Sequence, residues 1–250
     1  MGAKIQGSAG KRPAWSWDDV VAAEDENRPS KKVNRFSKRE ETKDHTLTRF
    51  AHAPIEPERV TPLRADHRAA VEGRTIFPNS VVGPMETQRF LVSGHNNPKL
   101  GKAVRKHPWA GMALYHLTLE ERRTCPKSCA QWLSCYGNAM PYARRHDPFH
   151  PHFEALLEAE LWLLAREHAD TGFVVRLHTL GDFYSTAYVD LWARWLDQIP
   201  GLHAYGYTAW DPEETEIGRA VQRLAGARWD RFAIRFSNRP GVQGTVVIER

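Results

Sequence analysis

The stretch that decides the fold is FVVRLHTLGD, residues 173–182. It opens with an apolar, β-favouring run and ends in Gly181 and Asp182, as a buried strand does where it runs into a loop. We therefore predict a strand at Phe173–Leu180. Similar runs predict four further strands, at Met112–Leu119, Leu202–Thr208, Arg231–Ser237 and Thr245–Ile248.

Amphipathic segments separate these strands. Apolar residues at three- and four-residue spacing predict a helix over His152–His168, and shorter patterns predict helices at Tyr188–Leu196 and Glu214–Leu224. Strands that alternate with helices indicate an α/β fold, either an open, mostly parallel sheet or a partial (βα) barrel. In both arrangements the functional loops follow the C-terminal ends of the strands.

The N-terminal third differs from the rest in composition. With 250 residues and 41% hydrophobic content, the chain has enough apolar material for one sizeable core. Residues 1–89 are polar and contain only short apolar runs, so we predict an irregular, partly disordered arm there and the α/β domain at 90–250. Two short helices within the arm, at Ser16–Ala23 and Arg64–Val71, are expected to dock on the domain.

The positive charge of the chain is concentrated in this arm. The formal net charge is +5, and the segment Arg28 to Arg49 alone has eight basic residues against three acidic ones. Such a segment favours contact with nucleic acid, although a solvated basic tail has the same composition. No apolar run approaches the roughly 20 residues of a membrane span, and no apolar signal core is present, so we expect a cytoplasmic protein without membrane contact and without disulfides.

The three cysteines of the protein, Cys125, Cys129 and Cys135, lie within eleven residues, directly after the first predicted strong strand. Clustered thiolates are soft ligands for zinc or for iron–sulfur clusters. A [4Fe–4S] cluster held by three cysteines leaves one iron open for a substrate or cofactor. A structural zinc needs a fourth ligand, for which the nearby histidines are candidates: His116, His146, His150 and His152. Unligated cysteines are the third alternative, and the spacing does not separate the first two.

Polar residues on the predicted strands are candidates for binding a cofactor. Arg176 and His178 alternate with apolar residues and would share a face that lines a cavity. The same alternation groups His203, Tyr205 and Tyr207 on one strand and Arg235 and Ser237 on another. These groups suit a carboxylate, a ribose or a phosphate. Asp182 is either a ligand for such a group or the N-cap of the helix that follows it.

The cysteine loop resembles that of the radical S-adenosylmethionine (SAM) superfamily. The likeness rests on three cysteines after the first strand, an aromatic residue, Tyr136, next to the last cysteine, and Gly181-Asp182 at the end of the second strand. The second cysteine gap is five residues long, whereas the superfamily usually has two. The resemblance implies a [4Fe–4S] cluster on the cysteines, SAM on the open iron, Gly181 and Asp182 at the SAM amino group, weaker contacts from Arg235 and Ser237, and an electron donor as partner.

A closer resemblance covers Val92 to Asn238. It is to a family of phage and bacterial proteins named after a mycobacteriophage gene product, gene product 88. The motifs that carry it are Cys135-Tyr136, Val175 to His178, Gly181 to Ser185, Tyr205 to Ala209 and Ile234 to Ser237. The phage association, which implies the host cytoplasm, and the basic arm together suggest an enzyme that modifies or isomerises a nucleic-acid base. The rivals are a zinc-stabilised nucleic-acid-binding protein without catalysis and an accessory protein that acts only through protein contacts.

Overall fold

The fold is that of a computed structural model, which describes residues 62–250 except 88, 97–99, 106–107, 238–243 and 246–250. Four predictions fall wholly or partly outside these residues. They concern the irregular arm at 1–89, the helix at Ser16–Ala23, the basic segment Arg28 to Arg49 and most of the last strand.

The core is a six-stranded sheet in the order β2-β3-β5-β6-β7-β8. The strands are β2 (Val92–Ser93), β3 (Ala113–His116), β5 (Phe173–Leu177), β6 (Leu202–Thr208), β7 (Phe232–Ser237) and β8 (Gly244–Thr245). Every neighbouring pair is parallel except β2 with β3. The predicted α/β class with a mostly parallel sheet is therefore confirmed.

The first two long strands are shorter than predicted. β3 ends at His116 and β5 at Leu177, because beyond these residues the ladder gives way to single hydrogen bonds. The amide of Leu117 still donates to the carbonyl of Arg176 at 3.2 Å. The amide of Leu119 donates to the carbonyl of Leu180 at 3.0 Å. The apolar pattern thus predicted two neighbouring segments but not where regular pairing stops.

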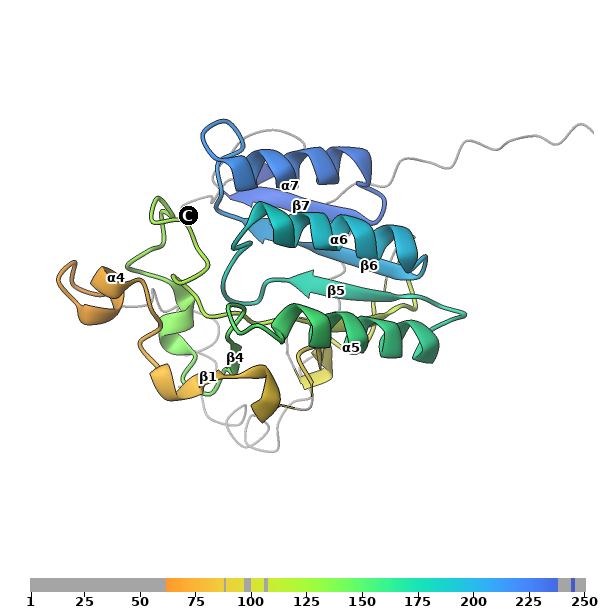
Figure 1. Ribbon diagram of the computed structural model, residues 1–250, viewed down its shortest axis with the longest axis horizontal. Helices are drawn as coiled ribbons and strands as arrows, with labels where there is room; N and C mark the ends of the chain where they lie inside the picture. Colours follow the sequence, from red (N-terminus) through yellow and green to blue (C-terminus); the bar gives the residue numbers. More distant parts are fainter. Residues whose placement is uncertain (1–61, 88, 97–99, 106–107, 238–243, 246–250) are drawn as a thin grey trace, which may run out of the picture.

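Three helices pack on one face of this sheet: α5 (Phe153–Glu167), α6 (Thr186–Gln198) and α7 (Glu216–Ala227) (Figure 1). Hydroxyl caps set two of the starts, since Ser185 accepts from the amide of Tyr188 and Thr215 from that of Gly218. The predicted helices began at Tyr188 and Glu214, because apolar spacing does not mark caps. Residues Phe173, Val175 and Leu177 face these helices in the main core.

The opposite face of the sheet has a smaller apolar cluster. Leu114, Val174, Tyr205 and Ala233 pack there against Leu100, Val104 and Trp109. Because α5, α6 and α7 all cover the other face and β3, β5, β6 and β7 follow one another in sequence order, the sheet is wound in one direction only, as in a partial (βα) barrel.

The described part of the N-terminal third packs beside the sheet. It contains α4 (Arg68–Glu72) and the 3-10 turns Pro78–Ser80 and Pro84–Glu86, and its strand β1 (Val81–Val82) pairs in parallel with β4 (Arg145–His146). The helix predicted at Arg64–Val71 begins later, since the His67 ring caps it, and it ends at Gly73. Two further 3-10 turns lie at Gly94–Asn96 and Tyr136–Ala139. Among the described residues, no helix has both the length and the apolar character of a membrane crossing.

Candidate functional site

The cysteine loop, residues 125–135, lies against the C-terminal end of β5. Thr124, one residue before the first cysteine, accepts a hydrogen bond from the backbone amide of Asp182 at 2.9 Å and donates to the carbonyl of Glu120 at 3.0 Å. Thr124 and Asp182 are both buried. The loop after β3 and the turn after β5 are therefore joined at the edge of the sheet where functional loops are expected.

Gly181 allows this close approach. Its φ is +81°, in the left-handed region that favours glycine, and a Cβ built on it would lie 2.7 Å from both Leu119 Cβ and Thr124 Oγ1. Any side chain at this position would push the cysteine loop away from the end of β5. The structure thus gives Gly181 a steric role, whichever ligand the site binds.

The three thiols are free and half-buried. Burial raises the pKa of each of them above its ordinary value. The negative charge of Asp182 raises the pKa of Cys125 and Cys129 further, and Cys125 also responds to the other two thiols. The structure therefore brings the three cysteines and Asp182 into one electrostatic neighbourhood, where thiolates need a cation or a metal centre to be stable.

Three thiols in one loop are soft ligands for zinc or for an iron–sulfur cluster. Among the described residues, no three His, Cys, Asp or Glu side chains are arranged closely enough to hold one metal ion. A zinc ion draws its ligands around one point, whereas each cysteine of a [4Fe–4S] cluster binds a different iron atom, so its sulfurs are more widely spaced. Three free, half-buried thiols in one loop can serve either kind of centre.

The four histidines considered as zinc ligands lie in different surroundings. His116 Nδ1 is 3.1 Å from the hydroxyl of Thr179, and His146 packs on Phe90 with ring centroids 5.0 Å apart. Burial lowers the pKa of both His116 and His146 to about 4, so both are neutral at pH 7. His150 and His152 lie against each other before α5.

Asp182 joins two strand ends and does not cap a helix. Its Oδ1 accepts from the amide of Phe183 and from the hydroxyl of Thr208, and its Oδ2 from the amide of Ala209, each at 2.8 Å. The side chain is buried, and this burial raises its pKa to about 7. The N-cap of α6 is Ser185 instead. Two hydrogen bonds from the end of β6, donated by Thr208 and Ala209, thus hold the carboxylate whose charge acts on Cys125 and Cys129.

Polar residues line the helix-free face of the sheet near its C-terminal edge. In the sheet register, Arg176 pairs with His116 on one side and with Tyr205 on the other, and Tyr207 pairs with Arg235. Tyr136 directly follows the last cysteine of the loop. Its ring is 45% exposed, but its hydroxyl lies in a desolvated setting that raises its pKa, while the charge of Arg176 opposes that shift.

The other predicted ligands lie further away or on the other side. Arg235 and exposed Ser237 are on β7, two strands from β5. His178 was predicted to share the face of Arg176, and this prediction is wrong. Its ring contacts Phe183 and Tyr188 in the helix-side core, since strand alternation ends at Leu177.

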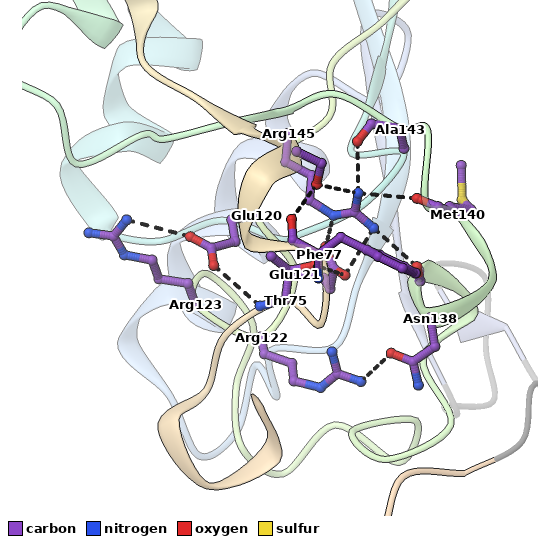
Figure 2. A network of polar contacts seen from close by, with 12 residues as sticks. Thr75, Phe77, Glu120, Glu121, Arg122, Arg123, Asn138, Met140, Ala143 and Arg145 are labelled. Carbon is purple, nitrogen blue, oxygen red and sulfur yellow. Dashed lines mark hydrogen bonds and ion pairs between the residues drawn. The ribbon is translucent and has the colours of Figure 1, made fainter. Parts of the chain in front are cut away.

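A network of buried charges, which the sequence reasoning missed, frames the cysteine loop (Figure 2). At its centre, Arg145 is 0% exposed and forms a bidentate ion pair with Glu121, at 2.6 and 3.1 Å. The same guanidinium donates to the carbonyls of Gly137, Met140 and Ala143 and to the hydroxyl of Ser80. Glu121 precedes the first cysteine and the three carbonyls follow the last, so this pair fastens both ends of the loop.

The neighbouring charges extend the network. Glu120 accepts from Arg74 at 2.6 Å and from the backbone amide of Thr75 at 3.2 Å, and Arg123 bonds to Asp147 at 2.9 Å. Arg122 donates to the carbonyl of Trp132 at 2.9 Å and to Asn138 Oδ1 at 2.6 Å. The run Glu-Glu-Arg-Arg directly before Thr124 is the sequence signal of this network, but such a run is more often a solvated surface.

One family model matches this chain. The family described as Gene product 88 matches residues 89–239, which is more than half of the chain and includes the cysteine loop and all strands from β2 to β7. No curated protein and no solved structure matches the chain.

Proposed function

The chain belongs to the gene product 88 family, and from this premise we propose that it is an iron–sulfur enzyme of the radical SAM type. The observation that carries the proposal is the junction between the cysteine loop and the end of β5. There the Thr124–Asp182 hydrogen bond joins the loop to the turn, and Gly181, which has no side chain, lets the two approach closely. Three free thiols are thereby placed near a buried carboxylate.

In this proposal Cys125, Cys129 and Cys135 would hold a [4Fe–4S] cluster, with SAM as the second cofactor. With one electron from a donor partner, the two cofactors would supply the abstraction of a hydrogen atom from an unreactive carbon. The chain supplies the placement. Asp182 is a further acceptor for the SAM amino group, because each carboxylate oxygen has two lone pairs and its three protein donors leave one unused. Arg235 and Ser237 would contact the SAM carboxylate or ribose.

We propose a nucleic-acid base as the substrate class, with base modification or isomerisation as the reaction. The support is the excess of five positive charges between Arg28 and Arg49, together with the phage association of the family. An electron donor is a required partner. Arg176 and Tyr207, which are half-buried on the helix-free face, offer a cationic and an aromatic contact for a base.

The direct test is anaerobic reconstitution followed by assays for iron, sulfide and zinc. Wild type should bind iron and sulfide in equal amounts, and Cys129→Ala should lose both. Ser134→Ala, next to Cys135, is the matched control and should keep them. A colourless protein that retains zinc would refute the proposal and support the zinc-stabilised nucleic-acid-binding protein.

A second assay separates SAM chemistry from cluster binding. The reduced, reconstituted protein should release 5′-deoxyadenosine from SAM, and Asp182→Ala should weaken SAM binding with the iron content unchanged. Calorimetry that detects no SAM binding to a protein with a full cluster would leave an iron–sulfur protein outside the radical SAM type.

The basic arm needs its own experiment. For the full chain, a plot of log DNA-binding constant against log salt concentration should have a slope of roughly −4 to −5, since about five phosphate contacts release that many counterions. Deletion of residues 1–53 should weaken duplex DNA binding and flatten this slope. SAM cleavage without substrate should stay unchanged. The same affinity and slope after deletion would exclude the arm as the contact.

A further inference from the structure

Four arginines surround the cysteine loop, and three of them have carboxylate partners. Arg145 pairs with Glu121, Arg123 with Glu120 and Asp147, and Arg74 with Glu120. Arg122 is the exception. In the part of the chain that the structure describes, all of its side-chain hydrogen bonds go to neutral oxygens: the carbonyls of Trp132 and Arg74 and the amide oxygen of Asn138.

Arg122 is also buried, with 3% of its surface exposed. A cation removed from water costs much free energy unless an anion is close to it. The backbone is fixed at the same residue in an unfavourable conformation, because Arg122 has a φ of +64°, which a residue with a side chain rarely adopts. A strained, buried cation without a carboxylate partner points to an anionic group that the protein holds nearby.

The position of the guanidinium identifies that group. Its Nε donates to the carbonyl of Trp132, between Cys129 and Cys135. Its Nη2 donates to Asn138 Oδ1, three residues after Cys135 (Figure 2). The charge of Arg122 also acts on Cys129 and Cys135 and favours their thiolates. At Cys135 the charge of Glu121, which is paired with Arg145, raises the pKa of the thiol and opposes the effect of Arg122.

We propose that Arg122 is the internal counter-charge of the anionic iron–sulfur centre in the cysteine loop and that it raises the reduction potential of that centre. The inference rests on the proposed function. A [4Fe–4S] cluster on three thiolates is negatively charged, and reduction adds one more negative charge. A fixed cation therefore stabilises the reduced form more than the oxidised form. Arg122 is a positioning and tuning residue in this role, because it acts through the loop and does not bind iron.

The test is a spectroelectrochemical titration of the reconstituted full chain and its variants, each with iron and sulfide measured. Arg122→Gln should lower the reduction potential. The expected size is about a tenfold fall in the ratio of reduced to oxidised cluster at a fixed solution potential, or about 59 mV for a one-electron couple. Arg122→Lys keeps the charge and should restore most of the potential. Arg123→Gln removes a charge one residue away, but the Arg123 side chain is 28% exposed and solvent screens its charge, so this change should shift the potential less than Arg122→Gln does.

A second variant tests the same charge without changing the arginine. Asn138→Asp places a carboxylate at the oxygen that Arg122 already contacts, so it should pair with the guanidinium and lower the potential in the same direction. Potentials for Arg122→Gln and Asn138→Asp that equal wild type, at full iron content, would overturn the inference and leave the proposed function intact. A wild-type chain that binds neither iron nor sulfide would overturn both.

Discussion

Removal of the buried guanidinium of Arg145 should be among the most destabilising single changes in this chain. Arg145→Met keeps most of the side-chain volume but leaves the Glu121 carboxylate buried without its partner. It also leaves three backbone carbonyls, those of Gly137, Met140 and Ala143, without this donor. The change therefore removes, at once, the ion pair before the cysteine loop and the hydrogen bonds to the carbonyls after it.

The magnitude follows from the burial of the pair. Breaking a fully buried ion pair by removing one partner costs about 3–5 kcal/mol, a large share of the roughly 5–15 kcal/mol that stabilises a typical domain. For a chain of this size each kcal/mol lowers the melting temperature by about 2–4 °C. We therefore expect a fall on the order of 10 °C or more.

Urea unfolding followed by tryptophan fluorescence, on the protein without metal, measures this loss. Arg144→Met is the matched control, because Arg144 is the exposed neighbour, and its unfolding midpoint should match that of wild type. The double variant Glu121→Gln with Arg145→Met removes the unpaired charge and should recover part of the lost stability. A midpoint for Arg145→Met within error of that for Arg144→Met would refute the role assigned to the buried pair.

Three further predictions concern the turn after β5. Asp182→Asn should lower the free energy of unfolding in urea by about 1–3 kcal/mol, because the new amide group would face the backbone amide of Ala209 and leave that donor unpaired. A variant as stable as wild type would contradict this hydrogen bond. The folded pKa of Asp182, about 7, lies above the unfolded value, so between about pH 4 and 7 the folded state binds the extra proton. The stability of wild type relative to Asp182→Asn should fall as pH rises through that window, by up to about 1.4 kcal/mol per pH unit, and a rise would reverse the assigned shift. Gly181→Ala should lower stability and iron binding more than Gly111→Ala does. Both glycines have a positive φ, but only at Gly181 would a Cβ clash with its neighbours. Equal losses for the two variants would mean that backbone strain alone explains the effect, and would refute the steric role of Gly181.

The sequence by itself was sufficient for the α/β class, for the order of the strands and helices of the main sheet from β3 to β7 and for the family. It succeeded because apolar periodicity reports burial of one face, which is a local property of each segment. β6 was found at its predicted bounds, Leu202–Thr208. The cysteines also stood out, since their clustering is visible without a fold.

Only the tertiary structure decided which side chains meet. Asp182 lies beside Cys125 because two parallel strands place their loops at one edge, although 57 positions separate the two in the chain. His178 lies on the helix side because strand alternation ends one residue before it. Arg145 and Glu121 form a buried pair, whereas Arg144 is exposed, and nothing in their residue types distinguishes the two arginines. The burial of a charge depends on what the rest of the chain packs around it, and that is a property of the whole fold.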